Sequence, residues 1–213
     1  MTTETRGRRT QEQRSSEMRR RILDATVLCL QEYGYGGTTT VRVVELAGVT
    51  RGALTHHFAS KADMVAAAVS HIAAIRTADV LSKLEQTMAA DDPVDAGLDL
   101  LWAVHQGPLF VAVVELWVAA RTDRELQRRV AAIERDTTAM VVDIAKSLFG
   151  ADADNTAIPR AVYTAMDAVR GIQLTRIATP DLTDEHEARW RRAKADLRIV
   201  FENALAPQRP PTP

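Results

Sequence analysis

Residues 38–61 of this 213-residue chain, TTTVRVVELAGVTRGALTHHFASK, constrain its fold more than any other stretch. They read as a short helix, a tight turn at Ala47-Gly48-Val49, a second short helix and the start of a third. Gly48 stands where the chain must leave the first helix sharply, and glycine adopts a left-handed backbone there without a steric cost.

Apolar and capping residues in this segment fall where two crossing helices need them. Thr50 can cap the second helix, and Ser60 with Asp63 forms a Ser-x-x-Asp start signal for the third. The positions that would share a small core are Val43, Val44, Ala47, Val49 and Leu54. Because the intervening residues are polar, the unit has one face to bury. This order predicts a helix-turn-helix, a motif that places its second helix in the major groove of DNA.

The charge distribution supports contact with phosphates at one end of the molecule. Residues 1–61 hold ten Lys or Arg against six acidic residues, a net charge of +4, and the remainder of the chain is −5. A basic first third joined to an acidic remainder indicates a polyanion-binding surface at the N-terminal end only. The arginines of residues 1–14 fit either a solvated tail or a flexible arm that touches phosphates or the minor groove, and the sequence leaves both open.

The rest of the chain reads as helix, because no segment shows the sustained alternation of a strand. Helices are expected at about 16–33, at two positions within 38–57, and at about 61–89, 93–105, 108–121, 122–149, 156–178 and 184–205. The signals include Asp92-Pro93 at one start, a Thr122-x-x-Glu125 capping box at another, and Gly150 at an end. The prediction is an all-α fold of about nine helices.

Four parts are expected: a disordered basic arm at 1–14, a DNA-binding domain at 15–60, a helical ligand-binding and dimerisation domain at 61–206, and a disordered tail at 207–213. The composition, 46% apolar and 26% charged, is that of a soluble globular protein. We see neither an uninterrupted apolar run that would span a bilayer nor a secretory signal, so a cytoplasmic protein is expected. The single cysteine, Cys29, is expected to be a buried core thiol.

The last two expected helices, at about 156–178 and 184–205, carry the clearest apolar faces. The earlier face is a stripe of small residues, Ala161, Ala165, Ala168 and Ile172, and the later one comprises Trp190, Ala193, Leu197, Val200, Phe201 and Ala204. Small residues let helices approach closely, so the pair suits a four-helix bundle with a second copy of the chain. Packing within one subunit would give the same pattern. A two-fold protein matches a palindromic DNA site, which favours the homodimer.

The N-terminal residues resemble the tetracycline-repressor (TetR) family of bacterial regulators over about residues 16–65. The resemblance is carried by Arg21 to Ala25, Glu32-Tyr33-Gly34-Tyr35, Thr38-Thr39, Ala47 to Leu54, His57-Phe58 and Ser60-Lys61, and more weakly in the body by Ala119 to Leu126. It implies a homodimer that binds double-stranded operator DNA, usually as a repressor, and releases it when a small molecule enters the body. Two residues depart from the family pattern: Thr55 stands where a phosphate-contacting tyrosine is frequent, and Val44 replaces the usual alanine.

The resemblance and the helix geometry together nominate residues for DNA contact. They are Thr39, Arg42, Thr50, Arg51, Gly52, Thr55, His56, His57 and Lys61. Arg51 can pair two donors with guanine or grip a phosphate, and Lys61 at a helix N-terminus can meet phosphate. His56 is expected to contact DNA and His57 to be structural. A zinc site at the two histidines is excluded, because adjacent residues point to different sides of a helix and no Cys or acidic partner has ligand spacing.

The body is expected to enclose a pocket for an unidentified effector between its middle helices. The bulky or half-polar residues available to line it are Trp102, His105, Phe110, Trp117, Met140, Tyr163 and Met166. Any one of them fits plain core packing as well, and His105 is the best candidate for a polar contact with a ligand.

Other classes of function fit less well. The chain offers no glycine-rich phosphate cradle, metal-ligand cluster or nucleophile elbow, so we expect neither an enzyme nor a cofactor. The alternative that remains is a helical protein-interaction module that has lost operator binding.

Overall fold

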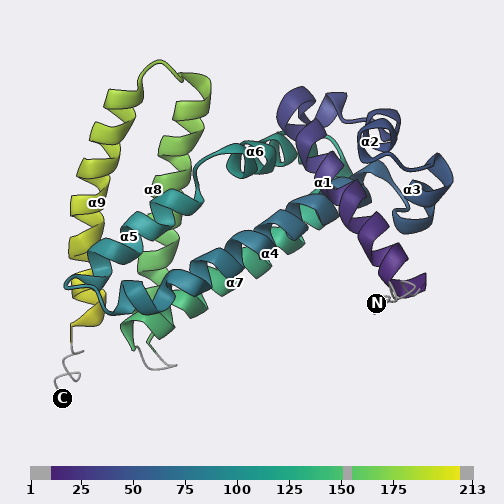
Figure 1. Ribbon diagram of the computed structural model, residues 1–213. Helices are drawn as coiled ribbons and strands as arrows, with labels where there is room; N and C mark the ends of the chain where they lie inside the picture. Colours follow the sequence, from purple (N-terminus) through teal and green to yellow (C-terminus); the bar gives the residue numbers. More distant parts are fainter. Residues whose placement is uncertain (1–10, 151–154, 207–213) are drawn as a thin grey trace, which may run out of the picture.

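The computed structural model describes residues 11–150 and 155–206, and these residues form nine α-helices and no strand (Figure 1). The helices are α1 Gln11–Gly37, α2 Thr40–Ala47, α3 Arg51–His57, α4 Lys61–Met88, α5 Pro93–Val104, α6 Pro108–Ala120, α7 Arg124–Phe149, α8 Ala157–Ala178 and α9 Thr183–Leu205. Helices α1 to α3 gather at one end, α4 and α7 run side by side through the middle, and α8 and α9 pair at the other end. The predicted all-α fold is confirmed.

The first helix begins earlier than the sequence indicated. It starts at Gln11, so the expectation of disorder is wrong for residues 11–14, while residues 1–10 and the tail at 207–213 lie outside the described residues. Gly34 breaks the same helix near its end, with φ 63° and ψ −177°. A glycine serves here because a side chain strains this region of φ.

Capping side chains fix the motif helices. The hydroxyl of Thr39 accepts from the amide of Arg42, and that of Thr50 accepts from the amide of Ala53. Gly48 ends α2 in the left-handed conformation, at φ 61° and ψ 42°. The predicted glycine turn and the Thr50 cap are therefore confirmed. The start signal of the third helix is confirmed as well, because the amide of Asp63 donates to the hydroxyl of Ser60.

Two caps differ from the sequence prediction. Asp123, not Thr122, caps α7, because its carboxylate accepts from the amides of both Glu125 and Leu126 at 3.0 Å. The hydroxyl of Thr122 instead donates to the carbonyl of Ala119 in the preceding turn. At the start of α8 the amide of Ala157 donates to the side chain of Asn155, one residue before the expected boundary.

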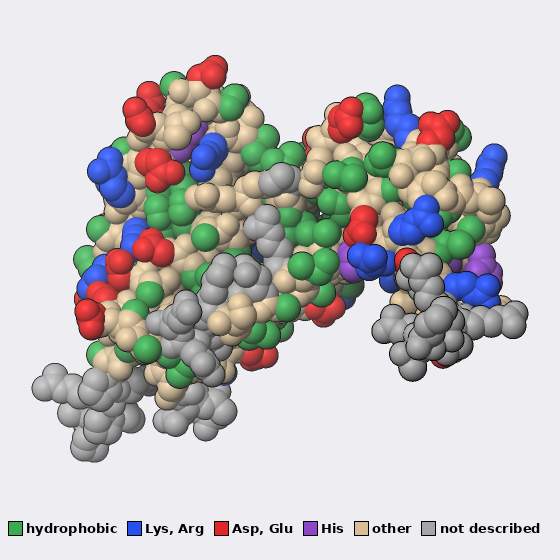
Figure 2. All heavy atoms as spheres, viewed as in Figure 1, with side chains coloured by type: hydrophobic (Ala, Val, Ile, Leu, Met, Phe, Trp, Pro, Cys, Tyr) green, Lys and Arg blue, Asp and Glu red, His purple; other side chains and the backbone are tan. Residues whose placement is uncertain are grey.

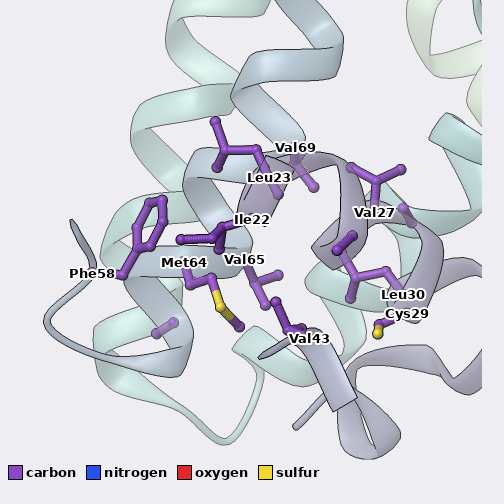
Figure 3. Packing of buried hydrophobic residues seen from close by; sticks show 14 of the residues in the cluster. Ile22, Leu23, Val27, Cys29, Leu30, Val43, Phe58, Met64, Val65 and Val69 are labelled. Carbon is purple, nitrogen blue, oxygen red and sulfur yellow. The ribbon is translucent and has the colours of Figure 1, made fainter. Parts of the chain in front are cut away.

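One core joins the DNA-binding end to the body. Ile22 of α1, Val43 of α2, Leu54 of α3 and Met64 of α4 are buried together. Figure 3 shows Ile22, Val43 and Met64 pointing toward one another. Cys29 lies in the same core, and burial raises the pKa of its thiol, as expected of a core cysteine.

Helix α4 departs from one expectation. By length and mean hydropathy its segment Lys61–Ser82 could cross a membrane, and the bent pair α5 and α6 passes the same test jointly. Its buried residues, such as Met64, Val65 and Val69, pack against α1 and the body helices in this structure. Only 31% of that window is buried in this structure, and one or two such helices are weak evidence for a membrane span.

The apolar stripes of α8 and α9 face inward. Ala161, Ala165, Trp190, Leu197 and Phe201 are buried within their own subunit, in a second core shared with α5 and α7. Assigning these stripes to a dimer interface was therefore wrong. The outward faces expose Tyr163, Leu174 and Ile177 on α8, and on α9 Ile199 together with Val200, a residue of the predicted stripe that is not buried.

We expect Gly48→Ala to lower the free energy of unfolding by about 1–3 kcal/mol, because the residue keeps a positive φ and a Cβ there would lie 2.9 Å from Nη2 of Arg21. Urea denaturation followed by circular dichroism measures the change. Gly52→Ala is the matched control: it lies inside α3, its Cβ meets nothing closer than 3.9 Å, and it should raise stability by about 0.5–1 kcal/mol. Equal effects of the two variants would contradict the assigned turn geometry.

Candidate DNA interface and ligand cavity

Helix α3 presents one continuous exposed face. Leu54 is only 2% exposed and anchors the helix in the motif core. The residues that remain exposed around it are Thr50, Arg51, Gly52, Thr55 and His56. In the space-filling view, Lys, Arg and His side chains are spread over the end formed by α1 to α3 (Figure 2). This face is a short helical ridge that a groove could receive.

Some predicted contact residues already have internal partners. The hydroxyl of Thr55 donates back to the carbonyls of Arg51 and Gly52, as threonine hydroxyls do within helices. Arg42 donates to the carbonyl of Gly37 at 2.5 Å, and its guanidinium lies 4.5 Å from the ring centre of Tyr33. Thr39 and Arg42 both remain exposed, so these bonds orient the side chains without removing them from solvent.

His57 and Lys61 are turned toward the protein. His57 is half-buried, and desolvation lowers the pKa of its imidazole, with the nearby His56 and Arg19 acting in the same direction. Lys61 donates to the carbonyl of Tyr35 at 2.5 Å and lies 4.2 Å from the centre of that ring. This geometry favours a role for Lys61 in positioning the motif over the phosphate contact expected from the sequence.

Arg21 is a residue that sequence reasoning did not single out. Its Nη2 donates to the carbonyl of Ala47 at 2.5 Å and to that of Gly48 at 3.0 Å. One guanidinium from α1 therefore holds the turn between α2 and α3. The last four carbonyls of a helix have no hydrogen-bond partner within it. Here the charged guanidinium of Arg21 donates to two carbonyls at the end of α2.

Polar contacts connect the motif to the body. The amide of Tyr35 donates to Glu115 of α6 at 3.2 Å, and the hydroxyl of Ser60 donates to Glu125 of α7 at 2.8 Å. Asp63 of α4 pairs with Arg129 of α7 at 2.8 Å. We call the first two contacts, Tyr35–Glu115 and Ser60–Glu125, the interdomain latch, and the Asp63–Arg129 pair joins two body helices beside it. The latch fixes the orientation of the motif relative to α6 and α7.

The body encloses a cavity of about 190 Å³ between α4, α5, α6, α7 and α8. Four of the predicted residues line it: His105, Phe110, Trp117 and Met140. The other three predictions are wrong. Trp102 stacks on Trp190 at 4.7 Å in the core, Met166 is buried in that core, and Tyr163 is exposed on the outer face of α8.

A polar cluster at one end of the cavity was missed. Glu134 of α7 accepts from Nε1 of Trp117 at 3.1 Å and pairs with Nη1 of Arg170 of α8 at 3.0 Å. His105 also lines the cavity, as do Thr77 and Thr137, and its Nδ1 lies 2.9 Å from the carbonyl of Leu101. Burial lowers the pKa of His105 to about 4. A charged pair from two helices far apart in sequence has no local signature, so only the fold reveals it.

Within the described residues, no group of three or more His, Cys, Asp or Glu side chains is placed to hold a metal ion.

Three comparisons bear on this arrangement. Residues 22–68 match the family model described as bacterial regulatory proteins, tetR family. An uncharacterized HTH-type transcriptional regulator of Mycobacterium tuberculosis is 32% identical over 146 residues, which cover 68% of this chain and 74% of that protein. The HTH-type transcriptional repressor AcnR of Corynebacterium diphtheriae is 28% identical over 54% of this chain and 56% of its own. The crystal structure of a putative TetR-family regulator from Mesorhizobium loti superposes with a TM-score of 0.69 at 16% identity, covering 89% of this chain and 98% of that one.

The depressed pKa of His105 predicts an acid-dependent loss of stability. The neutral ring is favoured in the folded state, so the stability present above pH 6.5 declines as the pH falls toward 4, by up to about 3 kcal/mol. Urea denaturation at a series of pH values measures this decline. His105→Gln, which does not titrate, should lose less stability over the same range, and parallel curves for the two proteins would contradict the assignment.

Proposed function

The chain belongs to the TetR family of bacterial transcriptional regulators, and from this premise we propose that α3 reads operator DNA through Thr50, Arg51, Gly52, Thr55 and His56. The protein is a DNA-binding transcriptional regulator and not an enzyme. The exposed face of α3, held by the buried Leu54, is the observation that carries the proposal.

Each residue has a proposed role. Arg51 begins α3 and stands exposed, so its guanidinium can pair with guanine or grip a phosphate. Thr39 and Arg42 contact the DNA backbone from α2, and Gly52 allows close approach. His57 and Lys61 act indirectly, by holding α3 and the start of α4 in place. The N-terminal arm, residues 1–10 with the exposed first turn of α1, supplies further positive charge toward phosphates.

We propose that residues 11–60 form the DNA-binding domain and residues 61–206 the regulatory domain. Two copies associate through the outward faces of α8 and α9, where Leu174 and Ile199 are 48% and 58% exposed. A homodimer doubles the DNA contacts and matches a palindromic operator. Operator binding assigns the protein to the cytoplasm.

The same proposal assigns the cavity to a small-molecule effector that releases a repressor from DNA. Helices α6 and α7 line the cavity and also carry the body side of the interdomain latch, at Glu115 and Glu125. A ligand that separates these helices would alter the latch and so the placement of α3. Differential affinity of a ligand for two arrangements of the latch is what such regulation requires.

Arg51→Ala should weaken binding to the preferred operator by about tenfold or more and flatten discrimination between sites, because a bidentate contact to guanine contributes about 1–3 kcal/mol. Selection of bound sites from random DNA supplies the operator, and mobility-shift titration at several salt concentrations measures affinity. Arg135→Ala, an exposed arginine midway along α7, is the control and should change neither quantity.

Unchanged discrimination by Arg51→Ala would remove Arg51 from the reading role. Failure of the natural protein to bind any selected site at moderate salt would instead support the alternative, a helical interaction module without operator binding.

The double variant Leu174→Asp/Ile199→Asp should shift the protein from dimer to monomer and lower operator affinity, because buried carboxylates without partners disfavour association. Sedimentation velocity measures the oligomeric state. Met88→Asp places the same charge on a half-exposed apolar residue of α4 and should leave the dimer intact. A dimer of unchanged affinity in the double variant would locate the interface elsewhere.

A further inference from the structure

We propose that the cavity takes an uncharged amphiphile, a small molecule with one hydroxyl head group and an unbranched apolar tail. This inference rests on the proposed function, in which an effector occupies the body, and it adds the chemical class of that effector. Charge and hydrogen-bonding capacity at the polar end and apolar surface along the rest of the cavity carry the argument.

A cationic head group is disfavoured because Arg170 already occupies the position beside Glu134 where it would bind. Both carboxylate oxygens of Glu134 have partners: one accepts a hydrogen bond from Trp117 and the other forms an ion pair with Arg170. The guanidinium of Arg170 also lies 5.2 Å from the ring centre of Trp117, where a ligand cation would otherwise stack. A positively charged ligand would have to displace this internal cation.

An anionic head group lacks a net positive charge to meet. The charge of Arg170 is balanced by Glu134 at 3.0 Å. His105 lines the same end but is neutral near pH 7, since burial depresses its pKa to about 4. Burial of a carboxylate beside a balanced pair costs free energy that no third charge offsets.

The hydrogen-bonding groups that remain suit a hydroxyl. Nε of Arg170 is buried with no partner, so it is a free donor. Nδ1 of His105 donates to the carbonyl of Leu101, and in the neutral ring this leaves Nε2 as an acceptor. A hydroxyl both accepts and donates, so it complements this pair, whereas a carbonyl or ether can only accept.

The lining and the size of the rest of the cavity determine the kind of tail that the ligand can have. Beyond the polar cluster it is lined mainly by aliphatic and aromatic side chains, with Thr77 and Thr137 among them, as far as Leu148 and Phe149 at the end of α7. Glu134 and Leu148 are separated by roughly 21 Å of helix axis, so the space is elongated. Its volume of about 190 Å³ exceeds the roughly 150 Å³ of an apolar cavity that accepts benzene. A chain of roughly eight carbons fits this size and shape.

The test compares head groups on one tail. Isothermal titration of the full-length natural protein at pH 7.5 uses 1-octanol, octanoate and octylamine, which share a tail and differ in charge. We expect 1-octanol to bind at least tenfold more tightly than either ion. Binding of octanoate or octylamine as tight as that of 1-octanol, or no binding of 1-octanol, would overturn the proposal.

Two variants separate the head-group contact from the tail contact. Glu134→Gln/Arg170→Met removes both charges together and the free donor, and should weaken 1-octanol binding about fivefold or more. Ala145→Leu adds bulk to the apolar wall and should shift the preferred alcohol from 1-octanol to 1-hexanol while keeping the preference for alcohol over ion. If the double variant does not fold, the head-group series on the natural protein and the Ala145→Leu shift still decide the matter.

Operator binding is measured in parallel on the ligand-free protein, so that the two hypotheses can fail separately. A protein that binds its operator but not 1-octanol retains the proposed function and loses this inference. A protein that binds 1-octanol but no operator retains the ligand class and loses the proposed function. If both hold, 1-octanol should weaken operator binding in the mobility-shift assay.

Discussion

The guanidinium of Arg21 is the contact on which the DNA-binding end depends. It reaches from α1 to two carbonyls of the turn between α2 and α3, where Gly48 already has a left-handed backbone. These contacts fix the direction in which the chain leaves α2, and the buried Leu54 then packs α3 against the core. Because the helix has only seven residues, its orientation comes from these tertiary contacts and not from its own hydrogen bonds.

Helices α4, α6 and α7 connect the two ends of the molecule. Helix α4 begins beside the motif, packs along α7 and lines the cavity with Val69, Ala73 and Thr77. Helices α6 and α7 combine cavity residues with latch residues in the same way. These helices therefore join the cavity wall to the motif, and a shift of packed helices is one recognised form of switching transition.

Local signals in the sequence were sufficient for the fold and for the motif. The Gly48 turn and the Thr50 cap depend on residues within a few positions, and these predictions were confirmed, whereas α1 begins at Gln11 and Asp123 instead of Thr122 caps α7. The misses have another origin. Trp102 and Tyr163 show the same helical periodicity whether they line a cavity, fill a core or face outward, so only the packing of α5 and α8 separates these outcomes. The Glu134–Arg170 pair and the Arg21 contact join residues far apart in the chain, and no spacing rule predicts them. Which residues touch DNA and ligand remains a prediction.

Gly34 has a consequence for how such a regulator can be adjusted. A Cβ at this position would lie 2.7 Å from the carboxylate of Glu115, and its φ is positive. Position 34 therefore favours glycine, so a change at this contact is more easily made at Glu115. Exchanging Glu115 for a shorter or neutral side chain would weaken the contact between its carboxylate and the amide of Tyr35 and leave the residues of α3 unchanged.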